Sequence, residues 1–175
     1  LAGRAKAIVR GAMIAGLVAV PISFALQGVD LLGESLSSAL SPRAWQVSSE
    51  SPYTATLTLA VIALAAGLAS LADPLRARIA SAGALLAAGA AFSLSGHASS
   101  APPQALTWFV VFLHTVAVGF WVGSLIPLAF QMASPDKAGI GVLARFSAAV
   151  PYAIAGLVGA GLVLVLVQLR EPSDL

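Results

Sequence analysis

Charged residues are rare in this chain and gather in short clusters, which leaves long apolar stretches without any charge. Only 9% of the 175 residues are charged and 59% are hydrophobic, whereas roughly a quarter of the residues in a soluble domain are charged. So few charges cannot cover a globule with a wetted surface, and a lipid bilayer is the solvent that fits the pattern. We therefore predict an all-α fold, a polytopic bundle of about five transmembrane helices.

The apolar stretches define the expected spans, because about 20 apolar residues are needed to cross a bilayer as a helix. The first stretch is too long for a cleavable signal peptide and has no clear cleavage site after it. Since the sequence begins with Leu1 rather than Met, we expect it to be part of a longer chain. A single transmembrane domain over residues 1–175 is predicted, with spans at about 8–27, 54–72, 79–96, 105–132 and 143–169.

The segment between the first and second spans is longer than a simple turn. Within Val29–Leu40 the apolar residues recur at helical spacing, and most polar residues fall on the other side. This pattern predicts a short helix that lies at the membrane interface. Ser51 followed by Pro52 is typical of a helix start and predicts the beginning of the second span there.

The basic residues predict the orientation of the bundle, because positively charged loops stay in the cytoplasm. With five crossings, seven basic residues fall on the side of the amino terminus and two on the other side. The amino terminus is therefore expected in the cytoplasm of a multi-pass protein of the plasma membrane, the inner membrane of a Gram-negative cell. The larger group comprises Arg4, Lys6, Arg10, Arg76, Arg78, Lys137 and Arg145, and the smaller group Arg43 and Arg170.

Several classes of function are disfavoured by what the sequence lacks. There is no cysteine, which excludes structural disulfides, thiolate zinc sites and thiol redox chemistry. The net charge of +2 is too small to suggest a nucleic-acid partner. No charged residue lies in the central part of any span, although ion-coupled carriers commonly keep such groups there. We expect no enzymatic activity, and the sequence leaves open whether the chain forms a homo-oligomer.

The two histidines are the candidate metal ligands. His97 ends the third span, and His114 lies about 13 Å below the outer boundary of the fourth span at 1.5 Å per residue. A titratable side chain at that depth is costly and indicates a function, and imidazole suits copper, zinc, iron and nickel. The alternative is that His114 only donates a hydrogen bond to a neighbouring helix and that His97 is an ordinary surface histidine.

The depth offset between the histidines leaves two arrangements open. One ion could touch both rings if the Pro-Pro turn dips inward, or the rings could be successive sites on an entry path. Met13 and Met132, at the inner ends of two spans, could bind Cu(I) through sulfur, although such methionines usually pack. Trp121 lies one heptad after His114 and on nearly the same face.

Several short motifs follow one another along the chain. They are Leu26-Gln27-Gly28, Gly96-His97-Ala98, His114, the run from Trp121 to Leu128, and Arg145-Phe146-Ser147. Together they resemble one family, the copper resistance protein D (CopD) family, which has a G-H-A turn and then a helix with a histidine and a W-x-G-x-L-x-P-L run. The resemblance covers most of the chain and is densest between Gly96 and Ser147.

The resemblance implies an inner-membrane protein that imports copper ions received from a small periplasmic copper-binding protein. Carried over by position, His97 and His114 match the two histidines of the family and would bind the copper ion. One departure concerns Val111, which stands where the family usually has an aspartate three residues before the second histidine. The carboxylate that could orient the imidazole is therefore missing. Family members also usually continue with further helices.

Two other classes of function stay open. Two histidines on neighbouring helices can ligate haem in an electron-transfer subunit, but this needs both rings at matching depth, and the predicted offset argues against it. The chain could also be a structural or assembly subunit without metal, with histidines that are only hydrogen-bonded.

Overall fold

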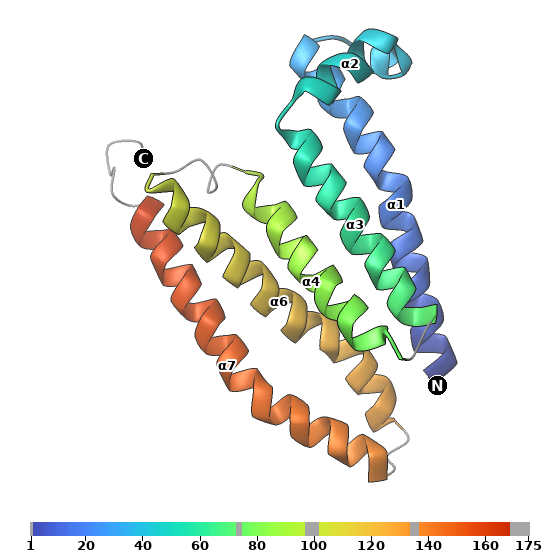
Figure 1. Ribbon diagram of the computed structural model, residues 1–175, viewed down its shortest axis with the longest axis vertical. Helices are drawn as coiled ribbons and strands as arrows, with labels where there is room; N and C mark the ends of the chain where they lie inside the picture. The colour runs from blue at the N-terminus through green and yellow to red at the C-terminus, as the bar shows by residue number, and fades with distance from the viewer. Residues whose placement is uncertain (1, 73–74, 97–101, 134–136, 169–175) are drawn as a thin grey trace. The chain divides into compact units, whose positions relative to one another are not determined.

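The computed structural model describes residues 2–72, 75–96, 102–133 and 137–168 (Figure 1). These residues form helices joined by short turns, with no strand among them, so the prediction of an all-α fold is confirmed. The elements are α1 (Ala2–Leu32), η1 (Leu36–Leu40), α2 (Pro42–Glu50), α3 (Tyr53–Ala72), α4 (Ala77–Ser93), α6 (Gln104–Met132) and α7 (Lys137–Gln168).

The helices have the length and composition of membrane spans. Four of them, α1, α3, α6 and α7, are long and apolar enough to cross a bilayer, and α4 is a shorter apolar helix. At 1.5 Å per residue, α4 is about 26 Å long, slightly less than a hydrocarbon core of about 30 Å. The apolar helices therefore identify a multi-pass membrane protein with a lipid environment.

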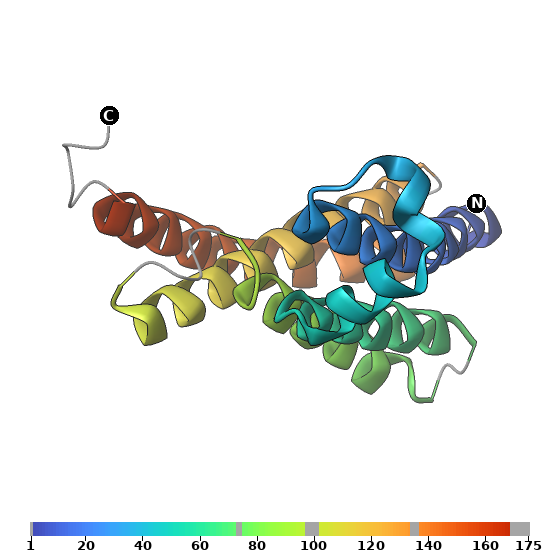
Figure 2. The same cartoon turned by 90° about the horizontal axis from the view of Figure 1, so that it is seen from above.

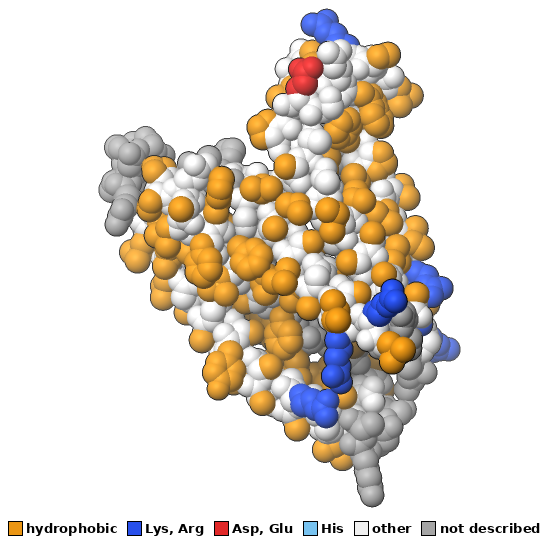
Figure 3. All heavy atoms as spheres, in the orientation of Figure 1, with side chains coloured by type: hydrophobic (Ala, Val, Ile, Leu, Met, Phe, Trp, Pro, Cys, Tyr) orange, Lys and Arg blue, Asp and Glu red, His pale blue; other side chains and the backbone are white. Residues whose placement is uncertain are grey.

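The apolar surface supports the same conclusion. Large hydrophobic side chains are exposed along the helices, among them Val18 on α1, Phe109 on α6 and Leu162 on α7. On the face that Figure 3 draws, apolar side chains predominate and the few charged side chains gather in small groups. Such a surface is unfavourable in water and suited to acyl chains.

The described residues fall into two compact units, residues 10–95 and residues 1–9 with 96–175. In the first unit α3 packs against both α1 and α4, and all three helices meet at Gly67. A Cβ at Gly67 would lie 2.6 Å from Met13 Cε of α1 and 4.0 Å from the Cβ of Ala84 in α4. Small residues let helices approach closely in membranes, which explains the Ala- and Gly-rich composition of α3 and α4.

A cap of residues 33–52 lies across the ends of α1 and α3 (Figure 2). Gly33 has a φ of +63°, a conformation that suits glycine, and α1 ends at the preceding residue. The prediction of one helix over Val29–Leu40 is therefore wrong, because Val29–Leu32 belongs to α1 and Leu36–Leu40 forms the separate η1. The second helix of the cap, α2, was not predicted.

The start of α2 follows from local chemistry. Ser41 is its N-cap residue, with an oxygen Oγ that accepts a hydrogen bond from the Ala44 amide at 3.2 Å. Pro42 occupies the first turn, where its missing N–H costs nothing. Farther along, the Ser51 hydroxyl accepts a hydrogen bond from the Tyr53 amide at 3.2 Å, which places the start of α3 where the Ser-Pro pair predicted it.

Three contacts seat the cap on α1. Gly28 lies so close to Ala44 that a Cβ at position 28 would overlap the Ala44 carbonyl oxygen. The buried Ser48 hydroxyl donates a hydrogen bond to the carbonyl of Phe24. The Phe24 and Trp45 rings lie with their centroids 5.3 Å apart at an interplanar angle of 53°. Backbone approach, a buried hydrogen bond and a ring contact thus fix α2 against the end of α1.

The second unit contains the hairpin of α6 and α7. The rings of Phe120 on α6 and Phe146 on α7 are stacked with centroids 6.2 Å apart. Farther along, a Cβ at Gly156 of α7 would lie 3.9 Å from a methyl group of Leu113 on α6. Leu113 and Phe120 are one heptad apart and mark the side of α6 that faces α7.

Candidate functional site

His114 lies within the apolar helix α6, ten residues after its first residue, Gln104. This corresponds to a depth of about 15 Å from that end at 1.5 Å per residue. No charged residue occurs anywhere in α6. An imidazole in this position is surrounded along its own helix by apolar and small polar side chains.

The His114 ring is on the buried side of α6. Successive residues of a helix are about 100° apart, so His114 is turned away from Leu113 and from the side that faces α7. It shares its side of the helix with Thr107, Val110 and Ala117, which are all buried. His114 itself is half-buried. The His114 side chain therefore lies on the less exposed side of α6.

One ring nitrogen of His114 is buried without a partner. Nδ1 is shielded from solvent and makes no hydrogen bond within the described part of the chain. The expected alternative, a hydrogen bond from this ring to a neighbouring helix, is not observed at Nδ1 among these residues. Leaving a buried polar atom unpaired costs about 1–3 kcal/mol. Nδ1 of His114 is thus a candidate ligand for a metal ion.

The second predicted ligand, His97, lies outside the described residues. Within the described residues, no group of three or more His, Cys, Asp or Glu side chains is positioned to hold a metal ion. His114 is the only described member of the predicted pair.

The surroundings of His114 contain no carboxylate on its own helix. Val111, half-buried, lies one turn before the histidine on α6. Trp121, also half-buried, lies about two turns after it. Gly119 and Gly123 have the G-x-x-x-G spacing that often marks a close contact between membrane helices. No such contact occurs at Gly123, because a Cβ there would meet nothing within 4 Å among the described residues.

The methionines separate into a packed one and an exposed one. The thioether of Met13 rests on Gly67, with Cε and Sδ at 2.6 and 2.9 Å from the position of an added Cβ. Met132, the last residue of α6, is 39% exposed. Met13 therefore has a packing role, which is the usual role of methionine in a membrane helix.

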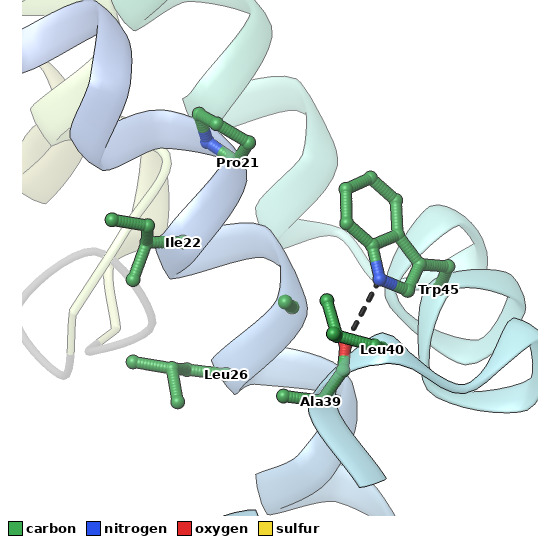
Figure 4. A pocket seen from close by; sticks show the side chains of 7 residues that line it. Pro21, Ile22, Leu26, Ala39, Leu40 and Trp45 are labelled. Carbon is green, nitrogen blue, oxygen red and sulfur yellow. Dashed lines mark hydrogen bonds between the residues drawn. The ribbon is translucent and has the colours of Figure 1, made fainter. Parts of the chain in front are cut away.

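Sequence reasoning missed the groove between α1 and the cap, an open apolar cavity of about 270 Å³. Trp45 of α2 forms one of its walls (Figure 4). The start of α2, which contributes Trp45 to the groove, could have been predicted from Ser41-Pro42, a helix start of the same kind as Ser51-Pro52.

The comparisons with known proteins give no family for this chain: no model of a protein family, no curated protein and no solved structure matches it.

Proposed function

We propose that this protein moves copper ions across the plasma membrane and that His114 is an intramembrane ligand on their path. The observation that carries the proposal is the buried, unpartnered Nδ1 of His114 in the interior of an apolar helix. A free lone pair at this nitrogen can bind a metal ion when the ring proton is on Nε2. His97, at the outer end of the third span, would receive the ion first.

Copper enters this proposal as cargo and not as a resident cofactor. A permanent centre usually has three or four protein ligands, whereas the described residues contain one histidine and no group of three or more His, Cys, Asp or Glu side chains that could hold a metal ion. An ion in transit needs ligands weak enough to release it, and conduction generally requires binding sites that can be left again. A single histidine within the span, with His97 expected from the sequence at the outer boundary, fits this requirement.

The distribution of charge supports an outward placement of both histidines. The basic residues Arg4, Lys6 and Arg10 at the start of α1 favour a cytoplasmic position for this end. An odd number of crossings then puts the outer ends of α4 and α6 on the opposite side. His97 follows α4, and His114 lies in the half of α6 that begins on that side. A small periplasmic copper-binding protein would deliver the ion there.

The test is a copper-binding measurement on the purified protein in detergent. The protein is equilibrated with Cu(I) under a reductant, desalted, and its metal content determined for the original chain, His97→Ala, His114→Ala and the double variant. Ser124→Ala is the matched control, because Ser124 is a polar residue of the same helix that hydrogen-bonds to the Phe120 carbonyl at 2.6 Å.

We expect the original chain and Ser124→Ala to retain copper and the double histidine variant to lose it. His114→Ala alone should weaken copper binding by at least about 10-fold, because losing even a group that only orients a metal ligand lowers metal affinity by about that factor. The proposal fails if the original chain binds no copper, or if the double variant binds as much as the original. A Soret band in the visible spectrum would support the haem alternative instead.

A further inference from the structure

The groove beside the cap is built from three elements and is apolar throughout its lining. Its walls come from α1, from η1 and from α2, and together they line one space of about 270 Å³ (Figure 4). This volume is just below the roughly 300–1,000 Å³ of small-molecule sites, so it suits a segment of a flexible chain. The side chains that carry the argument are Pro21, Ile22, Leu26, Ala39, Leu40 and Trp45.

Trp45 makes two contacts that hold it at the edge of this groove. Its indole Nε1–H donates a hydrogen bond to the Ala39 carbonyl at 2.9 Å, and its ring contacts Phe24. The polar atom of the indole is therefore satisfied inside the cap. The groove presents hydrocarbon surface only, and a polar ligand would find no partner among the side chains that line it.

The groove continues an exposed apolar stripe of α1. Ile14, Val18, Ile22 and Leu26 follow one another at intervals of four residues on α1 and are 43–57% exposed. This stripe runs along an apolar helix that is long enough to span the bilayer. Its last two members, Ile22 and Leu26, also line the groove. An acyl chain lying along α1 would therefore enter the groove without leaving apolar surface.

The depth of the groove agrees with this placement. Residues 11–29 of α1, between Arg10 and Asp30, carry no charge and extend for about 28 Å, close to the thickness of the hydrocarbon core. Leu26 and Ile22 lie within about the last 10 Å of this length. Trp45 lines the same groove, at the level expected for the boundary between headgroups and acyl chains, where tryptophan is enriched in membrane proteins.

We propose that this groove binds the upper part of one phospholipid acyl chain and that Trp45 packs against it. The charges of the cap region argue for recognition of the chain rather than of an anionic headgroup. Arg43 is its one basic residue, against the carboxylates of Asp30, Glu34 and Glu50. The net negative charge repels acidic phospholipids. The bound lipid attaches the cap to the membrane and keeps the outer end of α1 in a fixed position.

Fluorescence quenching by brominated lipids tests the proposal. Replacing Trp108 and Trp121 with Phe leaves Trp45 as the only tryptophan. The protein is reconstituted into phosphatidylcholine vesicles with bromine near the carboxyl end of the acyl chain or near its methyl end. We expect strong quenching by the first lipid and weak quenching by the second. Absence of quenching by both lipids would show Trp45 in water and overturn the proposal.

A groove-filling variant separates a bound chain from random lipid contact. Ala39→Phe places a ring in the groove but leaves the backbone carbonyl that holds Trp45, so quenching should be lost. Ala12→Phe adds the same ring to an exposed position of α1 outside the groove and should change nothing. Equal quenching in Ala39→Phe and the parent overturns the proposal, and so does stronger quenching by brominated acidic lipid than by brominated phosphatidylcholine.

Discussion

Gly28 of α1 lies directly against the backbone carbonyl of Ala44 in α2, and no side chain fits between them. A Cβ at position 28 would also lie 2.9 Å from the Ser48 hydroxyl oxygen. The carbonyl belongs to a regular helix and cannot turn aside as a flexible side chain could. The cap must therefore lift from α1 if position 28 acquires a side chain.

We predict that Gly28→Ala destabilises the protein by about 1–3 kcal/mol, the usual cost of overpacking. The measurement is the free energy of unfolding in mixed micelles, together with protease cleavage in the cap. Gly11→Ala is the control on the same helix, because a Cβ there meets nothing within 4 Å. Equal stability of the two variants would contradict the close packing at Gly28.

Ser48 and Ser49 are neighbours on α2 with opposite surroundings, and they give a second prediction. Ser48 is buried and hydrogen-bonds to Phe24 on α1, whereas Ser49 is exposed and bonds to Gln46 within its own helix at 2.7 Å. Ser48→Ala should lower the free energy of unfolding by about 1 kcal/mol. Ser49→Ala should leave it nearly unchanged. A reversed order of the two effects would show that the cap is not seated through Ser48.

The cap shows where prediction of the fold from sequence reached its limit. The long apolar helices could be predicted because hydropathy and length determine them together. The segment after the first span could not, because Val29, Leu32, Leu36 and Leu40 keep helical spacing across the end of one helix and the whole of another. The helix ends because the backbone at Gly33 has a positive φ. The spacing of apolar side chains gives no information about that backbone angle.

A third prediction concerns Met13 and separates packing from metal binding. Its thioether fills the space above Gly67, where three helices meet. Met13→Leu conserves volume and hydrophobicity, so it should cost less than about 1.5 kcal/mol. It should also leave the copper content of the purified protein unchanged. A loss of copper in Met13→Leu, with stability preserved, would show that the sulfur is a ligand.

The candidate site could be predicted only in part. His114 could be recognised from the sequence as a candidate site residue, because it is the one histidine of an apolar helix that carries no charge. The structure places it on the buried side of α6. The absence of a partner for Nδ1 among the described residues is a property of three-dimensional packing, which helical periodicity does not reveal. The relation between His114 and His97 depends on residues outside the described part.

A fourth prediction follows from the unpaired nitrogen of His114. His114→Leu removes a buried polar atom that has no partner among the described residues, so the metal-free protein should become more stable by about 1–3 kcal/mol. The same variant should retain less copper. Gain of stability with loss of binding is the signature of a residue kept for function. If His114→Leu instead destabilises the metal-free protein, the imidazole has a packing or hydrogen-bonding role.

A last prediction adds a carboxylate to the site. Residues three apart on a helix are neighbours, so Val111→Asp puts an acceptor within reach of the His114 ring. A carboxylate that accepts the ring N–H fixes the tautomer and makes the other nitrogen a better ligand, an effect of about 10–100-fold on metal affinity. We therefore expect Val111→Asp to bind copper more tightly than the original chain, as measured by competition with a Cu(I) chelator.

Val116→Asp is the matched control for that experiment. Val116 is also half-buried on α6, but two residues from the histidine along a helix is about 200° around it, and an acid there cannot reach the ring. Both variants carry the same cost of a carboxylate in an apolar helix, so the difference between them reports on the contact with His114. Tighter binding in Val111→Asp alone would show that this imidazole holds the ion, and equal affinities would show that it does not.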